Sequence, residues 1–199
     1  MNRAFATLVA LIATVIVLTG AVAFTAPALA QTTGPADVTL NELDGSGTDG
    51  DPYIVTTTSE LQAIENDTTA HYRLDNDIDA SATAQWNDGK GFDPIGSFSG
   101  SFDGDGNEIS DLYIDRPSTN NVGLFGRTKS SGSISNVHLE NVSIEGRNIV
   151  GALVGRNQGT IAGSSATGNV TGRNRVGGLI GKMGSNTVSN SYADVTVEG

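Results

Sequence analysis

The residues best suited to chemistry in this chain of 199 amino acids are aspartates, concentrated in its first half. Asp75, Asp77 and Asp79 alternate with other residues, so in a strand their carboxylates would share one face and could hold a hard cation. The run from Asp103 to Glu108 (DGDGNE) resembles part of a calcium loop, but it lacks the EF-hand glycine position and the closing glutamate. A solvated acidic face and a tight turn explain these patterns without a metal. We therefore expect no cofactor, and calcium is the alternative.

Several catalytic classes lack their residues. The chain has no cysteine and only two histidines, His71 and His138, without an H-E-x-x-H or a G-x-S-x-G motif. Paired carboxylates in the acidic half would suit a polysaccharide lyase or glycosidase, but the basic residues Arg73 and Lys90 are not tied to the aspartates by any motif. We expect no catalysis in this chain, and a carbohydrate-active β-helix enzyme is the alternative.

Three N-x-[ST] sequons are candidate glycosylation sites. They begin at Asn66, Asn141 and Asn169, and none has proline at the middle position. Chance is the competing explanation, because Asn, Ser and Thr are all frequent in this sequence.

The elements that would position these residues are indicated by a repeat. Val-Gly pairs begin at Val122, Val150 and Val176, so the unit length is 28 and then 26 residues. A fixed period of this size indicates stacked supersecondary units, none of which buries its apolar side alone. The units span Asn120–Gly146, Arg147–Gly172 and Arg173–Gly199.

Each unit reads as short strands rather than helices. Apolar residues alternate with polar ones, as at Val142/Ile144 and Val195/Val197, and glycine or asparagine clusters separate the runs. Two or three short strands in about 27 residues predict one coil of a parallel β-helix, with coils stacked at ~4.8 Å. A leucine-rich repeat is the alternative, because Ile134–Val142 resembles its strand pattern, but Gly163 and Ser165 break that pattern in the next unit.

These residues resemble the GLUG repeat. VGLFG, VGALVG and VGGLIG at Val122, Val150 and Val176 match its opening, and Asn157–Ile161, Ala166–Gly172 and Asn190–Ala193 match its later parts. The first copy departs from the pattern with Phe125 and a longer turn. The resemblance implies a right-handed parallel β-helix of the kind found in large exported, adhesin-like proteins and beside IgA1-protease-type metallopeptidases.

Residues 1–30 are predicted to be a signal peptide. Arg3 is their only charge, an apolar stretch follows, and Ala28–Ala30 fits the small-x-small cleavage rule. An uncleaved membrane anchor is the alternative, because Ala4–Phe24 could span a bilayer. Either reading predicts an extracellular or cell-surface protein, in contact with the membrane only through this segment if it is uncleaved.

Residues 31–119 are predicted to form an acidic cap module and the first coils. Ser59–Gln62 fits a capping box that opens a short helix through about Asn66, and His71–Asp79 alternates as one strand. The order of its motifs resembles the module that precedes GLUG repeats, in which the helix covers the open end of the coils. Residues 120–199 are the three GLUG-type units.

Charge is unevenly distributed. Residues 31–119 carry 18 acidic and 3 basic side chains, whereas residues 120–199 carry 4 acidic and 7 basic ones. With 15 aspartates and 3 lysines, the composition resembles that of proteins from salt-loving organisms, although an ordinary acidic extracellular protein would fit as well. A net charge of −11 argues against a nucleic-acid partner.

The sequence therefore predicts an exported β-helix repeat protein with a structural or adhesive role. Its expected partner is a protein or glycan at the cell surface, bound by many weak contacts. Because no polar capping repeat follows the third unit, we expect the chain to be a fragment of a longer repeat protein, and end-to-end self-association through an open last coil or fraying of that coil are the alternatives. A non-catalytic spacer within a larger secreted peptidase is a further alternative.

Overall fold

The computed structural model describes residues 34–199. The predicted signal peptide, residues 1–30, lies outside this range, so its cleavage stays a prediction. Within residues 34–199, no helix has the length and apolar character needed to cross a membrane.

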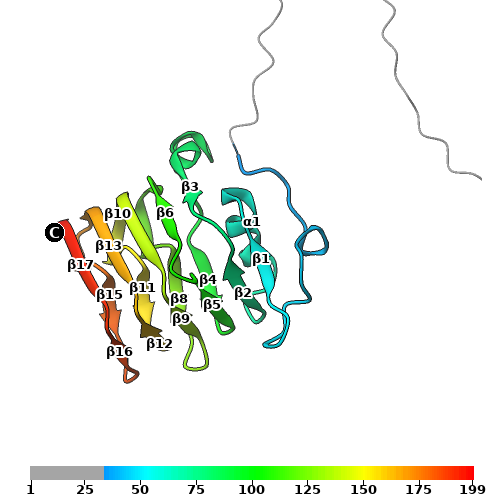
Figure 1. Ribbon diagram of the computed structural model, residues 1–199. Coiled ribbons are helices and arrows are strands. Elements are labelled where there is room, and N and C mark those ends of the chain that lie inside the picture. The colour runs from blue at the N-terminus through cyan, green and yellow to red at the C-terminus, as the bar shows by residue number, and fades with distance from the viewer. Residues whose placement is uncertain (1–33) are drawn as a thin grey trace, which may run out of the picture. The chain divides into compact units, whose positions relative to one another are not determined.

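The chain winds through three parallel sheets, which we number I to III (Figure 1). A coil passes from sheet III to sheet I and then to sheet II, as in the succession β8, β9, β10. Sheet I contains β1 (Tyr53–Val55), β2 (His71–Leu74), β5 (Ser101–Asp103), β9 (Ser133–Ser135), β12 (Thr160–Ala162) and β16 (Val188–Ser189). Sheet II contains β3 (Ile78–Asp79), β6 (Glu108–Ser110), β7 (Tyr113–Val122), β10 (His138–Val150), β13 (Ser165–Thr171), β14 (Asn174–Val176) and β17 (Tyr192–Glu198). Sheet III contains β4 (Ile95–Phe98), β8 (Phe125–Thr128), β11 (Val154–Asn157) and β15 (Ile180–Met183).

This architecture confirms the predicted all-β parallel β-helix with a short N-terminal helix. Equivalent residues of successive coils pair in register, because each strand bonds to its copy in the next coil. Residues 120–199 contain three strands per coil and no helix, so the leucine-rich alternative is wrong.

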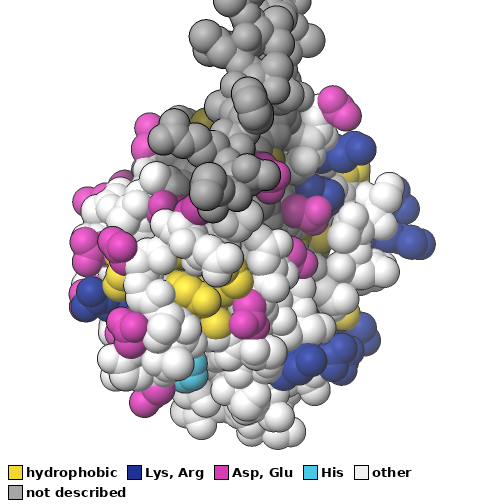
Figure 2. Space-filling view, turned by 90° about the vertical axis from the view of Figure 1, so that its right-hand side faces the viewer, with side chains coloured by type: hydrophobic (Ala, Val, Ile, Leu, Met, Phe, Trp, Pro, Cys, Tyr) yellow, Lys and Arg dark blue, Asp and Glu magenta, His cyan; other side chains and the backbone are white. Residues whose placement is uncertain are grey.

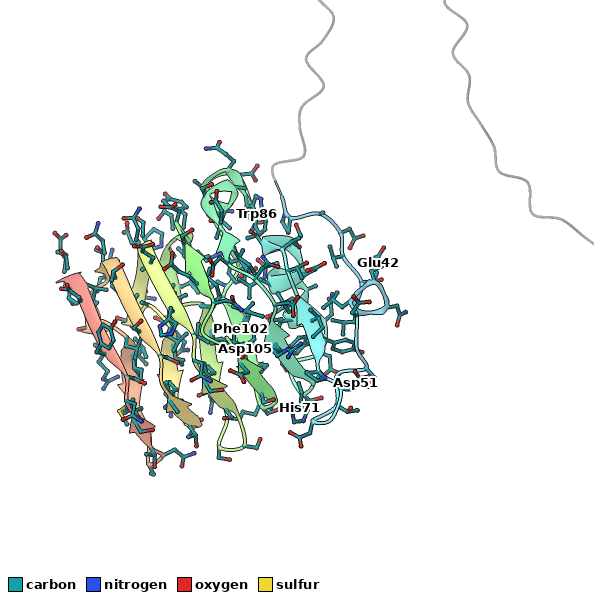
Figure 3. All side chains as sticks on the ribbon, viewed as in Figure 1. Glu42, Asp51, His71, Trp86, Phe102 and Asp105 are labelled. Atoms are coloured by element: carbon teal, nitrogen blue, oxygen red, sulfur yellow. The ribbon has the colours of Figure 1, made fainter. Side chains whose placement is uncertain are left out.

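The core consists of apolar residues stacked from coil to coil. In sheet I, Tyr72 pairs with Phe102 and Phe102 with Ile134, and all three are buried. Phe125 of sheet III packs its ring 5.5 Å from that of Phe102 and 4.9 Å from that of Phe98. Figure 3 shows Phe102 within the coil stack and Trp86 at its edge. Burying these large side chains is the main source of stability in this cysteine-free chain.

A short helical segment covers the N-terminal coil. It consists of α1 (Thr58–Ala63) and the 3₁₀ turn η2 (Ile64–Asn66), and it buries Leu61 and Ile64 completely. Two further 3₁₀ segments, η1 (Leu40–Glu42) and η3 (Ser81–Gln85), lie in the connections. The helix thereby supplies the apolar surface that the first coil needs at its open side.

The capping box of α1 lies two residues earlier than Ser59, where the sequence suggested it. Thr57 is the N-cap: its hydroxyl accepts a hydrogen bond from Glu60 N at 3.2 Å, and Glu60 Oε2 accepts one from Thr57 N at 3.0 Å. Both Thr57/Glu60 and Ser59/Gln62 have the spacing of three that a box requires. Gln62 is instead engaged with Asp93 of a later coil, so the first pair forms the cap.

The last coil is more exposed than the others. Tyr192 is 65% exposed, Met183 49% and Val197 45%. Within residues 34–199, its strands β15, β16 and β17 each pair on one side only. This coil therefore contributes less to the core than the coils before it.

Candidate binding groove between sheets II and III

The three predicted glycosylation asparagines are all exposed. Asn66 ends η2, Asn141 occupies a bulge in β10 with a φ of 51°, and Asn169 lies in β13. The Asn141 amide donates to Asp111 Oδ1 at 2.5 Å, and Asn169 is in register with Ser143, the hydroxyl residue of the Asn141 sequon. Their exposure fits modification, and glycosylation stays a prediction.

The predicted stripe of Asp75, Asp77 and Asp79 does not exist as one face. The chain leaves sheet I after Leu74 and enters sheet II at Ile78, so these aspartates surround a corner, and Asn76 between them is exposed. The alternation of residue types along the sequence does not reveal such a bend.

Each aspartate of this corner has its own local partner. Asp75 lies 3.5 Å from the Arg73 guanidinium, Asp77 Oδ1 accepts from Glu108 N at 2.9 Å, and Asp79 Oδ1 accepts from Ser81 N at 2.8 Å. The bonds from Ser81 hold the pKa of Asp79 below its ordinary value. The three carboxylates are therefore engaged separately, Asp75 with a side-chain cation and Asp77 and Asp79 with backbone N–H groups.

The Asp103–Glu108 run forms a turn. Asp105 and Gly106 both have positive φ, and Asp103 Oδ1 accepts hydrogen bonds from Asp105 N and from the amide of Asn136, each at 3.0 Å. Across residues 34–199, no three His, Asp or Glu side chains come together in an arrangement that could hold a metal ion.

The two histidines occupy equivalent roles in different sheets. His71 Nδ1 lies 2.7 Å from Ser101 Oγ, and His138 Nδ1 lies 2.8 Å from Ser165 Oγ, in each case on the next coil. Figure 3 shows His71 in the N-terminal part of the solenoid. Both histidines therefore link neighbouring coils.

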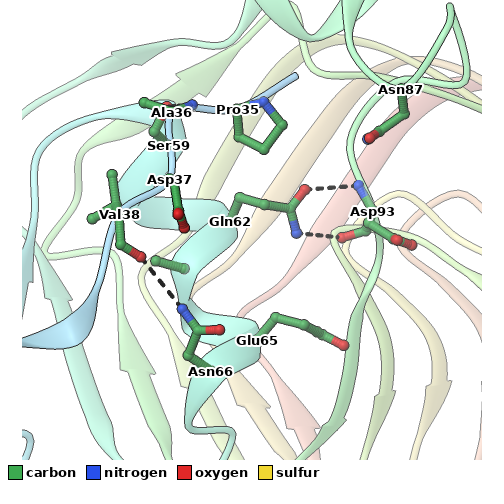
Figure 4. Close-up of a pocket in the computed structure, with 11 residues that line it drawn as sticks. Pro35, Ala36, Asp37, Val38, Ser59, Gln62, Glu65, Asn66, Asn87 and Asp93 are labelled. Atoms are coloured by element: carbon green, nitrogen blue, oxygen red, sulfur yellow. Dashed lines mark hydrogen bonds between the residues drawn. The ribbon is translucent and has the colours of Figure 1, made fainter. Parts of the chain in front are cut away.

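A hollow of about 330 Å³ lies beside the helical cap (Figure 4). The Gln62 amide makes two hydrogen bonds to the backbone of Asp93, of 3.0 and 2.9 Å, and Glu65 Oε2 accepts from Gly96 N at 2.7 Å. Burial raises the pKa of the Glu65 carboxyl above its ordinary value, and the charge of Asp93 adds to the rise, while the bond from Gly96 opposes it. These polar groups attach the helical cap to the coils, so we interpret the hollow as part of the packing between cap and coils and not as a binding site.

A row of cations crosses the outward face of sheet III. Arg127, Arg156 and Lys182 occupy matching positions in three successive coils. The Arg127 guanidinium is hydrogen-bonded to Gln158 Oε1, a neutral partner. Among residues 34–199, the basic members of the ion pairs are His71, Arg73 and Arg116, so no carboxylate pairs with this row.

A row of asparagines runs beside the cations. The Asn148 amide donates to Asn120 Oδ1, and the Asn174 amide donates to Asn148 Oδ1, both at 2.7 Å. These residues stand at the corner where sheet II ends, each followed by a residue with positive φ, namely Asn121, Ile149 and Arg175. The corner therefore repeats the same backbone geometry and the same amide in three successive coils.

The glycines of the repeat motif allow this corner to pack tightly. A Cβ on Gly155 would lie 2.7 Å from backbone atoms of Asn121 and Val122, and one on Gly181 would lie 2.6 Å from Val150 N. Only glycine permits this approach without displacing the neighbouring coil. Contact between coils thus explains the last glycine of VGALVG and of VGGLIG.

Two hollows join along this corner, and together we call them the corner groove. One, of about 560 Å³, is lined by the asparagine row, Arg156 and Arg175. The other, of about 310 Å³, includes Arg127, and Asn120 and Asn121 line both. The groove thus has a cationic wall and an amide wall that continue from coil to coil.

Sequence reasoning missed the groove residues, although a signal was present. Arg127, Arg156 and Lys182 each follow the last glycine of the motif, and Asn120, Asn148 and Asn174 each stand two residues before its valine. The repeat was predicted from its apolar and glycine positions, and its outward positions were not compared between units.

The outward face of sheet II has the opposite charge. Asp115 is in register with Glu145, and Glu140 with Ser110. A hydrogen bond with the Glu140 carboxyl, which needs a proton on one of the two acids, raises the pKa of Glu108 above its ordinary value, with smaller effects of burial and nearby charge. Viewed from the N-terminal end, many Lys and Arg side chains gather along one side of the molecule (Figure 2).

Comparison with known proteins supports the repeat assignment. The family model for the GLUG motif matches residues 146–171. The chain is 48% identical over 156 residues to a protein named halomucin from Haloquadratum walsbyi, in an alignment that covers 72% of this chain and 2% of that protein. It is 35% identical over 126 residues to a protein named as a Gly-rich membrane protein from Evansella cellulosilytica, covering 59% of this chain and 14% of that one.

The chain thus corresponds to a small part of these relatives. Among solved structures, a protein named as an immunoglobulin A1 protease from Bacteroides ovatus aligns with a TM-score of 0.39 and 18% identity, over 77% of this chain and 69% of that one. The unit that the family model matches, residues 146–171, extends from the end of β10 to the end of β13. The chain therefore carries the GLUG motif on a parallel β-helix, as its sequence resemblance implied.

Proposed function

We propose that this chain is part of an exported cell-surface protein and that its coils serve a structural and adhesive role. The observation that carries the proposal is the repetition of outward side chains in register. Arg127, Arg156 and Lys182 form one such row, and Asn120, Asn148 and Asn174 form another. Rows of this kind present the same contact several times along one axis, which suits multivalent binding to an extended partner.

Two further observations support a surface location. One relative is named a halomucin and another a membrane protein, and both are much longer than the aligned segment. The chain also carries a net charge of −11, which favours solubility in the extracellular medium. The partner in this proposal is a glycan or protein of the cell envelope.

Adhesion can be tested directly with envelopes of the producing organism. The purified chain, labelled with a fluorophore, is incubated with isolated envelopes, and the retained fluorescence is measured against an unrelated acidic protein of similar size. We expect saturable retention of this chain alone, with no new reducing ends released from envelope glycans. Equal retention of the two proteins, or glycan cleavage, would overturn the proposal.

A further inference from the structure

We propose that the corner groove binds an anionic polysaccharide, one that carries carboxylates or sulfates on successive sugars. This inference rests on the proposed adhesive function and names the ligand class and the site. It depends on three observations: a row of cations without acidic partners, a parallel row of amides, and a buried acceptor at the junction of the two hollows.

The cationic row is held in a costly arrangement. Arg156 stands in register with Arg127 on one side and with Lys182 on the other. Neighbouring coils are ~4.8 Å apart, and like charges that face each other across adjacent strands destabilise a sheet. Within residues 34–199, no carboxylate lies within ion-pair distance of these three cations, and Asp93, which lines the same hollow as Arg127, is paired with Arg116 at 3.5 Å. An anionic polymer along the row would relieve this repulsion and gain charge-assisted hydrogen bonds.

The opposite wall is suited to hydroxyl groups. Asn120, Asn148 and Asn174 present amides that both donate and accept hydrogen bonds. Asn121 Oδ1, where the two hollows meet, is buried and has no hydrogen-bond partner among the described residues. A buried acceptor without a donor is unfavourable, and a sugar hydroxyl is a donor of suitable size.

The groove chemistry favours a glycan over other polyanions. Binding of single-stranded nucleic acid relies on aromatic side chains that stack on bases, and no aromatic residue lines either hollow. An extended acidic peptide binds most readily by adding a strand to a sheet edge, whereas the cationic row lies across the face of sheet III. A polymer with one charge and several hydroxyls per unit uses both walls.

The test is titration calorimetry of the purified chain with an oligogalacturonate, with a neutral maltooligosaccharide of equal length as the comparison ligand. The groove variant is Arg156→Gln, and the matched control is Lys129→Gln, which removes one positive charge at an exposed turn outside both hollows. Circular dichroism checks that both variants are folded at the salt concentration used. Poly-glutamate and single-stranded DNA serve as alternative polyanions.

We expect the oligogalacturonate to bind and the neutral glycan not to. Arg156→Gln should weaken binding about 10-fold or more, because a charged hydrogen bond is lost, while Lys129→Gln changes it less than about 2-fold. No binding, equal losses in the two variants, or tighter binding of poly-glutamate or DNA would overturn the proposal. If envelope retention persists while Arg156→Gln has no effect on it, the groove assignment is wrong and the adhesive function stands.

Discussion

Sheets II and III share one core but present opposite chemistry to solvent. Sheet III carries the row Arg127, Arg156 and Lys182, whereas acidic residues such as Glu140 and Glu145 lie on sheet II. Both sheets bury apolar side chains in the same core. A β-helix can thus keep apolar residues at its buried positions while the charge of its outward rows differs from sheet to sheet. The stacked apolar pattern therefore leaves the binding chemistry to residues outside it.

The largest expected effect comes from breaking the corner that separates the two sheets. Gly155→Ala places a Cβ 2.7 Å from the backbone of the preceding coil, so we expect a loss of about 2–3 kcal/mol in the free energy of unfolding. Chemical denaturation measures it. Gly50→Ala is the control, because nothing lies within 4 Å of its added Cβ. Similar stabilities for the two variants would contradict the packing account of the motif.

A smaller loss is expected from the asparagine row. Asn148→Ala removes two hydrogen bonds of 2.7 Å to neighbouring coils and should cost about 1 kcal/mol, because Asn120 and Asn174 are exposed and regain water. Asn169→Ala, on the exposed face of sheet II, should change stability by less than about 0.5 kcal/mol. Urea denaturation of both variants compares the rows. Equal changes in stability would show that the hydrogen bonds of the asparagine row do not stabilise the fold.

Placing positive charge on sheet II tests whether charge alone distinguishes sheet III from sheet II. Glu140→Lys with Glu145→Lys places cations on sheet II at two positions that line neither hollow of the corner groove. We expect the affinity for oligogalacturonate to rise less than about 3-fold, because added surface charge alone contributes little. Calorimetry against the unaltered chain measures the change. An increase in affinity of about 10-fold or more, the size of the loss expected for Arg156→Gln, would mean that charge alone determines binding.

The smallest effect concerns the acidic face and pH. The raised pKa of Glu108 means that this group favours the folded state below the ordinary pKa of glutamate, and that the contribution is lost as pH rises through the folded value. Glu140→Gln should therefore stabilise the chain at pH 7 by a few tenths of a kcal/mol and have no effect near pH 3, since these groups are largely exposed. Urea denaturation at the two pH values tests it. If Glu140→Gln were less stable than the unaltered chain at pH 7, repulsion between Glu108 and Glu140 would not explain the effect.

The sequence was sufficient to predict the coil stack and its helical cap. The glycine-punctuated period reports a close contact between coils, Gly155 against Asn121 and Gly181 against Val150, so it is visible without coordinates. The bend at Asp75–Asp77 was missed, because alternation looks the same in one strand and in two strands that meet at a corner.

The groove was missed for a different reason. The register partners Ile95, Phe125, Val154 and Ile180 are 30, 29 and 26 residues apart, so no single period aligns the outward positions. The unequal loops decide which side chains stand side by side, so the units have to be aligned on the valine and last glycine of the motif rather than on a fixed period. The exchange of hydrogen bonds between Asn120, Asn148 and Asn174 also depends on that register.

The measurement that tests the central claim most directly is backbone amide chemical-shift mapping of the labelled chain during titration with oligogalacturonate. If the polymer binds in the corner groove, the shift changes concentrate at Arg127, Asn148 and Arg156, while the amide shifts of Glu140 and Glu145 on sheet II stay unchanged. Shifts centred on sheet II or on the hollow beside the helical cap would contradict it, as would spectra that do not change at all.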